Sequence, residues 1–411
     1  MIRRPRLVYV VTHPVTADVL LRGQLSFMRE HGFDVTVIGA PGPLLDQVRE
    51  REKVETIGVP MVRQNDARRD VVSLARLTAT LRRIRPDIVN AGTTKAGLLG
   101  MLAARAADVP IRIYLLRGLR LETASGIMRR ILGVTEKIAS ACAHDVACVS
   151  PSLLRLSVDG GYIPASKACV VASGSSNGVD TARFRRTPEL RARGAAILEE
   201  LGIAPEEPTI GFVGRLARDK GVRELLDAFE IVRKEVPRAK LVLLGGELAD
   251  EVAERSLIER IRATPNIVVT GTIADLAPYY ARMEVLAAPT YREGFPNVIV
   301  EAESAECPVV AFRSTGVVDA VVDGETGALV EQGDVRGLAR GIIDYLTDPA
   351  KAAATGERAR HRVTTLYARE IVWSEWLELY RDRLAQRGLP LPSGGGTPSR
   401  RTDPNEPALA R

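Results

Sequence analysis

Two carboxylates, Glu293 and Glu301, flank a Gly-Phe-Pro turn at residues 294–296. Proline suits the first position of a helix, because its missing N–H would have no partner there, and the residues from Asn297 onward have a helical pattern. The N-terminus of that helix directs free backbone N–H groups and the positive end of its dipole at the turn, which makes an anion site. Amides for a diphosphate and carboxylates for sugar hydroxyls would together suit a sugar nucleotide.

Two cations, Arg215 and Lys220, occur in the segment GRLARDKG at residues 214–221. The segment follows an apolar run, TIGFVG, that predicts a strand, and a helical pattern begins after it. Two flexible cations in such a loop can hold one diphosphate and stabilise the charge that develops as it leaves. Taken alone, each motif also has an ordinary explanation. Glu293 and Glu301 could be two solvated acids on a helix, and Arg215 and Lys220 could be two solvated cations in a loop.

Short apolar runs alternate with helical patterns along both halves of the chain, and residues 283–289 (MEVLAAP) are typical of a buried parallel strand. The alternation forms two consecutive sets of about 180 residues each. It predicts an α/β protein with two doubly wound, Rossmann-like domains that face each other across a cleft. Ligands bind at the carboxyl ends of the strands in such sheets, and Thr93 and Lys95 lie at such a strand-to-helix turn.

Composition excludes several classes of protein. With 411 residues, 45% hydrophobic and 26% charged, the chain is typical of a soluble globular protein of about two domains. No apolar run is long enough to span a membrane, and the opening run LVYVV is too short for a signal peptide. We therefore expect a cytoplasmic protein. The four cysteines form no C-x-x-C pair and no histidine has zinc spacing, so we expect reduced thiols and no metal site.

Charge is distributed unevenly. Residues 1–180 have 25 basic and 16 acidic side chains, a net charge of +9, whereas residues 181–390 have a net charge of −4. A basic half can meet an anionic membrane, an anionic acceptor or nucleic acid, and nucleic acid is the weakest of these because aromatic residues are only 4%. Residues 111–140 mix cations with apolar side chains, which fits either a helix on a membrane surface or an ordinary solvated helix.

The spacing E293-GFPNVIV-E301 resembles the E-x7-E signature of the GT4 (group 1) retaining glycosyltransferases, which have the GT-B fold. Further matches are K-A-G-L-L-G, R-G-L-R-L-E-T, N-G-V-D and G-R-x4-K-G, and neither G-x-G-x-x-G after the first strand nor a P-loop is present. The resemblance implies an acceptor-binding domain over 1–182 with a returning helix over about 371–386, and a donor domain over 183–370. The tail 387–411 is rich in Gly, Pro and Ser, and is predicted to be disordered.

The resemblance also implies roles for individual residues. Arg215, Lys220 and Glu293 would be catalytic, with Glu293 on the donor sugar, Glu301 on the ribose, and Gly271 and Thr272 near the nucleobase. The full set of donor-binding candidates is Gly214, Arg215, Lys220, Gly271, Thr272, Glu293, Gly294, Phe295, Pro296, Asn297 and Glu301, where the amides of residues 294–296 would help hold the diphosphate. The acceptor-side candidates are Arg22, Gly23, Thr93, Lys95 and Arg117, of which Arg117 stands where several relatives have a histidine.

The branch that the motifs most resemble extends lipid-linked oligosaccharides or builds capsule and exopolysaccharide. It implies retaining transfer of a hexose or N-acetylhexosamine from a nucleotide sugar, commonly UDP-linked, to a polyprenyl-diphosphate-linked saccharide at the inner face of the cell membrane. No metal or other cofactor is implied, because the departing phosphate accepts the acceptor proton. A soluble metabolite as acceptor, a GT-B epimerase or phosphorylase, and a non-catalytic sugar-nucleotide sensor remain alternatives.

Overall fold

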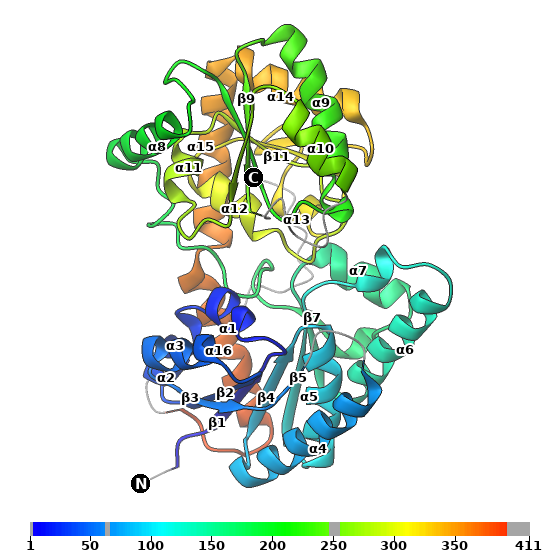
Figure 1. The fold of residues 1–411 in the computed structure, drawn as a ribbon. Coiled ribbons are helices and arrows are strands. Elements are labelled where there is room, and N and C mark those ends of the chain that lie inside the picture. The colour runs from blue at the N-terminus through cyan, green and yellow to red at the C-terminus, as the bar shows by residue number, and fades with distance from the viewer. Residues whose placement is uncertain (1–2, 62–65, 246–254, 393–411) are drawn as a thin grey trace.

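The computed structural model describes residues 3–61, 66–245 and 255–392, and it contains two parallel β-sheets, one in each half of the chain (Figure 1). The first sheet has the strand order β3-β2-β1-β4-β5-β6-β7 and the second has the order β10-β9-β8-β11-β12-β13. The strands of the first sheet are β1 (Arg6–Val10), β2 (Asp34–Gly39), β3 (Glu55–Gly58), β4 (Ile88–Gly92), β5 (Ile111–Leu116), β6 (Asp145–Cys148) and β7 (Ala168–Val170). Those of the second are β8 (Thr209–Val213), β9 (Lys240–Leu244), β10 (Ile267–Gly271), β11 (Val285–Ala288), β12 (Val309–Phe312) and β13 (Gly327–Val330). The predicted α/β, GT-B type of architecture is confirmed.

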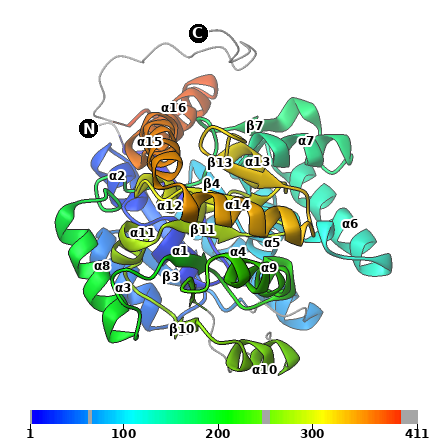
Figure 2. The ribbon, with the colours of Figure 1, turned by 90° about the horizontal axis from the view of Figure 1, so that it is seen from above.

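Helices cover both faces of each sheet, which explains why strands such as β4, β11 and β12 are buried at every residue. Around the first sheet lie α1 (Pro14–Leu20), α2 (Gln24–Glu30), α3 (Pro43–Glu52), α4 (Ala67–Ile84), α5 (Thr94–Ala106), α6 (Gly126–Cys142) and α7 (Pro151–Asp159). Around the second lie α8 (Pro188–Glu200), α9 (Val222–Glu235), α10 (Arg255–Ala263), α11 (Ala277–Arg282), α12 (Asn297–Ser304), α13 (Val317–Ala320), α14 (Val335–Thr347) and α15 (Pro349–Leu366). Figure 2 shows these layers from above.

The strand order reverses direction once in each sheet, between β1 and β4 and between β8 and β11. Sequential strands run outward from β1 to β3 and the chain then returns to β4 beside β1, and β8 and β11 repeat this arrangement in the second sheet. Loops at the carboxyl ends therefore part between β1 and β4 and between β8 and β11, the usual position of a ligand site in open α/β sheets.

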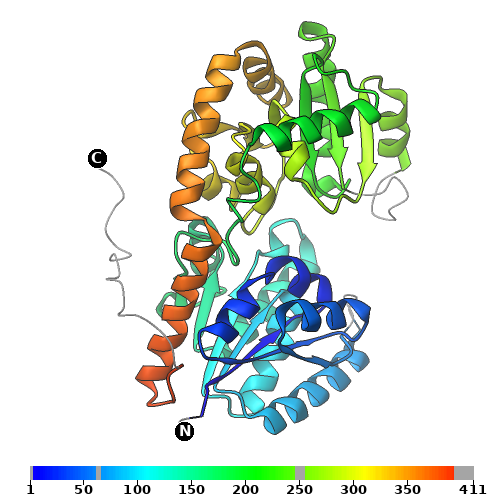
Figure 3. The ribbon, with the colours of Figure 1, turned by 90° about the vertical axis from the view of Figure 1, so that its left-hand side faces the viewer.

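The last helix, α16 (Arg369–Gln386), returns to the first sheet. Figure 3 shows α15 on the second half of the chain continuing into α16 on the first. The Tyr380 hydroxyl accepts a hydrogen bond from Asn90 Nδ2 at 2.7 Å, and Trp373 Nε1 donates to Asn177 Oδ1 at 2.8 Å. These contacts anchor the end of the second half on the first.

Residues 14–20 form the short helix α1, because Pro14 suits the first helical turn and the His13 ring accepts a hydrogen bond from the Val15 N–H. One detail differs from the sequence-based expectation. Pro296 directly precedes α12 rather than beginning it. Disorder was predicted for the tail 387–411, and residues 393–411 of that tail lie outside the described part of the chain. Within the described ranges, no helix is long and apolar enough to cross a membrane.

Candidate active site

An ion pair joins the loop after β8 to the loop after β11. Lys220 Nζ contacts Glu293 Oε1, and the Thr290 hydroxyl lies 3.4 Å from the same carboxylate oxygen. The side chains of Lys220 and Glu293 are 21% and 20% exposed, so solvent still reaches both. Since an ammonium has three N–H donors, Lys220 can keep Glu293 and bind a second anion.

Asp219 fixes these two loops together. Its carboxylate oxygen Oδ2 lies 3.3 Å from Arg215 Nη2 and 3.3 Å from Arg292 Nη2. Its backbone carbonyl accepts hydrogen bonds from the Tyr291 N–H at 3.0 Å and from the Thr290 hydroxyl at 3.2 Å. Both predicted cations therefore sit on a loop whose conformation is set by the strand end opposite it.

Gly221 allows the loops to approach this closely. Its φ is +66°, and a Cβ atom there would lie 1.9 Å from the carbonyl oxygen of Pro289. Any other residue would push the loop that carries Lys220 away from the turn that carries Glu293.

The turn after β11 also touches the first half of the chain. A Cβ atom on Gly294 would lie 2.0 Å from the carbonyl oxygen of Arg117, and the Ser150 hydroxyl donates to the Gly294 carbonyl at 2.7 Å. Beside it, the Thr315 hydroxyl donates to Glu122 Oε2 at 2.7 Å. The carboxyl ends of the two sheets therefore meet at this turn.

The prediction that the amide of Pro296 helps hold a diphosphate is wrong, because proline has no N–H. Gly294 and Phe295 retain theirs, and Asn297 begins α12. The Phe295 ring packs 4.9 Å from the Tyr367 ring, measured between centroids, and contributes to the cores of both halves. This packing holds the turn at the junction.

Glu301 lies on α12, where Tyr280 donates a hydrogen bond to its Oε2 at 3.2 Å. Burial raises the pKa of Glu301 to about 7, although the Tyr280 hydrogen bond and the charge of Arg183 oppose that shift. The carboxyl group is thus divided between its protonated and ionised forms near neutral pH. Further donors, such as ligand hydroxyls, would favour the carboxylate.

Arg117, at the end of β5, is a cation in a different setting. Its Nη1 donates to the Ser176 hydroxyl, while its Nε is buried with no hydrogen-bond partner among the described residues. Burial lowers the pKa of Arg117 to about 10, so the guanidinium stays charged at neutral pH. A desolvated cation of this kind favours an anionic ligand.

The other acceptor-side candidates in the βα turn after β4 point in different directions. The Thr93 hydroxyl lies 2.8 Å from the hydroxyl of Thr12, at the opening between β1 and β4, and Thr93 has a φ of +80°, which is strained for a residue with a side chain. Lys95 instead directs its ammonium to Asp70 of α4, at 2.9 Å. Thr93 thus faces the opening between the strands, and Lys95 faces the surface of α4.

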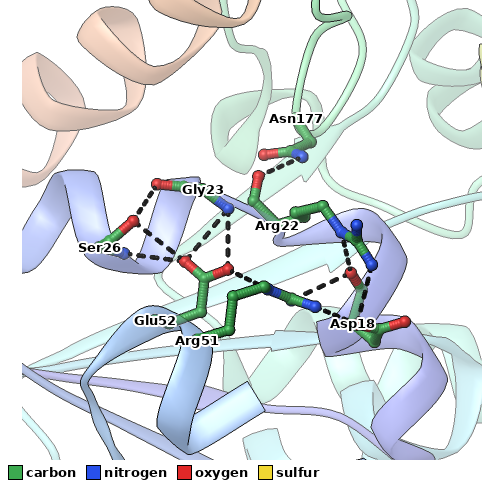
Figure 4. Close-up of polar contacts among 7 residues, drawn as sticks. All are labelled: Asp18, Arg22, Gly23, Ser26, Arg51, Glu52 and Asn177. Carbon is green, nitrogen blue, oxygen red and sulfur yellow. Dashed lines mark hydrogen bonds and ion pairs between the residues drawn. The ribbon is translucent and has the colours of Figure 1, made fainter. Parts of the chain in front are cut away.

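Figure 4 shows that Glu52 satisfies the N-terminus of α2. Its carboxylate accepts from the Gly23 N–H at 3.1 Å and from the Ser26 N–H at 3.2 Å. Arg22 pairs with Asp18 at 3.1 Å. A ligand anion at Gly23 would therefore have to displace an internal carboxylate.

The remaining donor-binding candidates lie on neighbouring loops of the second sheet. The Gly214 N–H donates to Leu244 O at 2.9 Å, and the Gly245 N–H donates to Gly271 O at 2.8 Å. Thr272 is exposed. These loops follow β8, β9 and β10, so the backbone around Gly214 and Gly271 is gathered at one edge.

Sequence reasoning missed several members of this site: Thr12, Ser150, Ser176, Asp219, Tyr280 and Thr290. Asp219 directly precedes Lys220 and could have been noticed from that position, whereas the others become significant only through contacts between distant segments. Across residues 3–61, 66–245 and 255–392, no group of three or more His, Cys, Asp or Glu side chains could hold a metal ion.

Two protein families match the chain. The family "Glycosyl transferases group 1" matches residues 207–348, and the family "Glycosyl transferase 4-like domain" matches residues 19–174. A capsular polysaccharide biosynthesis glycosyltransferase from Staphylococcus aureus is 34% identical over 89% of this chain and 94% of its own length.

Two further proteins are more distant. An Escherichia coli UDP-Gal:α-D-GlcNAc-diphosphoundecaprenol α-1,3-galactosyltransferase is 24% identical over 79% of this chain and 83% of its own length. The crystal structure of Anabaena HepE in complex with UDP and glucose has a TM-score of 0.77 at 19% identity. The match covers 92% of this chain and 100% of the HepE chain. At that identity the structural likeness concerns the fold.

Proposed function

This chain belongs to the group 1, GT4-type glycosyltransferases, and we propose that it transfers a hexose or N-acetylhexosamine from a UDP-sugar to a polyprenyl-diphosphate-linked saccharide in cell-surface polysaccharide synthesis. The observation that carries the proposal is the cation pair of the second half, with Lys220 held against Glu293 and Arg215 against Asp219, opposite Arg117 of the first half. A glycosyltransferase needs such an arrangement, with an anion site on one side and an acceptor site on the other.

The donor diphosphate would bind Arg215, Lys220 and the amides of Gly294 and Phe295. Lys220 would keep its contact with Glu293 while it binds phosphate, and the Glu293 carboxylate would then lie beside the donor sugar. Glu301 would accept hydrogen bonds from the ribose, and the backbone near Gly271 would meet the nucleobase.

We propose that transfer retains the anomeric configuration. The bond between the anomeric carbon and the diphosphate oxygen breaks as the bond to the acceptor oxygen forms, and the acceptor proton passes to the departing phosphate. Arg215 and Lys220 stabilise the charge that develops on that phosphate, so the proposal requires no metal. An NMR assignment of an inverted product would overturn this mechanism.

The lipid-linked acceptor is supported by the names of two relatives, one in capsular polysaccharide biosynthesis and one acting on a diphosphoundecaprenol saccharide. The net charge of +9 over residues 1–180 also favours an anionic acceptor. With such an acceptor the enzyme would work peripherally at the inner face of the cell membrane.

The test is transfer of label from a panel of UDP-sugars into butanol-extractable lipid, with bacterial membranes that carry sugar-primed polyprenyl diphosphate. Label in the lipid phase that Lys220→Ala abolishes is the expected result. Label that remains on the nucleotide, or that appears as an isomerised nucleotide sugar, would overturn the proposed acceptor and favour a soluble acceptor or an epimerase.

A further inference from the structure

Helix α6 exposes an apolar stripe on its outer face. Ile127, Ile131, Val134 and Ile138 recur every three to four residues and are 75%, 50%, 55% and 40% exposed. With Met128, they make five of the eleven large apolar side chains that are exposed in the described part of the chain. The helix packs on the protein through its other face, which includes Gly133, Glu136, Ala139 and Ser140. An uncovered stripe of this length indicates a surface that meets another apolar phase.

The charge on α6 indicates which phase. Arg129, Arg130 and Lys137 are all exposed. The one carboxylate in the helix, Glu136, is 3% exposed and accepts a hydrogen bond from the Tyr114 hydroxyl at 2.7 Å. The outer surface of α6 therefore combines apolar side chains with charged side chains that are all basic. This is the pattern of helices that lie in the interface of an anionic membrane.

The position of α6 connects it to the acceptor side of the site. The helix follows the short 3₁₀ segment Arg120–Glu122, and Glu122 accepts the hydrogen bond from Thr315 of the second half. That segment in turn follows Arg117. Figure 1 places α6 at the outer edge of the first half of the molecule, on the side away from α16.

We propose that α6 is the surface that docks this protein on an anionic lipid bilayer, with the stripe Ile127, Ile131, Val134 and Ile138 at the boundary of the acyl chains and Arg130 and Lys137 among the headgroup phosphates. The inference rests on the proposed lipid-linked acceptor, which would reach Arg117 from the same membrane. A second copy of the chain is the competing occupant. It is disfavoured because two copies of α6 would bring cations against cations.

Flotation of the full-length protein with vesicles tests the proposal. Wild type should bind vesicles that contain phosphatidylglycerol, should bind pure phosphatidylcholine less, and should dissociate as salt rises. Ile131→Asp should abolish binding, and Arg130→Gln and Lys137→Gln should each weaken it about fivefold. The matched control is Ile371→Asp on α16, an exposed isoleucine (38%) on another side of the molecule, which should bind like wild type.

Several outcomes would overturn the proposal. Wild type that stays free of anionic vesicles, or Ile131→Asp that binds as well as wild type, would each do so. Light scattering that shows a dimer which Ile131→Asp dissociates would assign the stripe to a second copy. Turnover on an acceptor with a shortened, water-soluble prenyl chain separates this inference from the proposed function. Ile131→Asp should keep that turnover, because a water-soluble acceptor needs no membrane docking. A wild type that is inactive on both the water-soluble and the membrane-bound acceptor would overturn the proposed function, but it would leave the result of the vesicle experiment standing.

Discussion

The two sides of the junction treat their cations in opposite ways. On the second half, Lys220 pairs with Glu293, and Arg215 and Arg292 share Asp219. On the first half, Arg117 has a serine hydroxyl as its side-chain partner, its Nε is unsatisfied, and no carboxylate within the described ranges forms an ion pair with it. On the second half each of these cations already has a carboxylate partner without a ligand, and on the first half Arg117 has none.

The presence or absence of a carboxylate partner changes how strongly each cation attracts an anionic ligand. A paired cation loses part of its attraction to a ligand because its own carboxylate competes, but the pair keeps it in position. An unpaired, desolvated cation costs stability in the free protein, and that cost is relieved when an anion arrives. We therefore expect the donor loops to be built for positioning, and Arg117 to be built for binding an anionic group of the substrate.

The strongest test of the donor side is Lys220→Ala. If Lys220 acts on the charge that develops on the leaving diphosphate, kcat should fall by about 10²–10³-fold, or about 2.7–4 kcal/mol. Steady-state rates with a UDP-sugar measure this. Arg218→Ala, which removes an exposed cation from the same loop, should leave kcat almost unchanged. A Lys220→Ala enzyme with normal turnover would remove Lys220 from the site.

Arg117→Met tests the other side. It should lower kcat/KM for the acceptor by about tenfold to a hundredfold, the scale of a lost hydrogen bond to a charged group. The melting temperature should be unchanged or higher, because a buried and unpaired charge is removed.

Arg112→Met is the matched control for that variant. Arg112 lies on the same strand, but its guanidinium donates to the carbonyls of Cys142 at 2.7 Å and Val109 at 2.9 Å. Its removal should lower stability and leave kcat/KM intact. If Arg117→Met behaves like Arg112→Met, the contrast between paired and unpaired cations fails.

Glu301 is a desolvated group on the donor side, and its titration sharpens the comparison. Its pKa rises from 4.5 to about 7 through burial, so between those pH values the folded state binds more protons than the unfolded state. The free energy of unfolding should therefore decrease as pH rises through this window. Glu301→Gln should flatten that dependence and add about 3 kcal/mol above the window. Urea unfolding at several pH values measures it.

The same group gives a prediction for binding. If ribose hydroxyls donate to the carboxylate, the donor KM of wild type should decrease as pH rises through about 7. Glu301→Gln should lose that dependence. A donor KM that does not vary with pH in wild type would remove Glu301 from the nucleotide site.

Local spacing was enough to predict the two parallel sheets and the loops that carry Arg215, Lys220 and Glu293, because strands, turns and helix starts depend on neighbouring residues. The contact of Ser150 with Gly294 and the capping of Gly23 by Glu52 join residues 144 and 29 positions apart, and they depend on how whole elements pack. Arg117 illustrates the limit most clearly. Its position after a strand was visible in the sequence, but its lack of a carboxylate partner is a property of the packed structure.

The smallest expected effect is that of Asp219→Asn. The substitution keeps the shape and the backbone carbonyl that binds Tyr291, but it removes the charge shared by Arg215 and Arg292. Because Arg215 is 51% exposed, the pair should contribute only about 0.5–1 kcal/mol, which is roughly a two- to fivefold rise in donor KM with kcat nearly constant. Donor saturation curves for Asp219→Asn and Lys220→Ala, measured together, distinguish a residue that positions a cation from the cation itself. If both variants lost kcat equally, the carboxylates of the donor loops would be acting on the substrate directly, and the view that they only pair with and position their cations would be wrong.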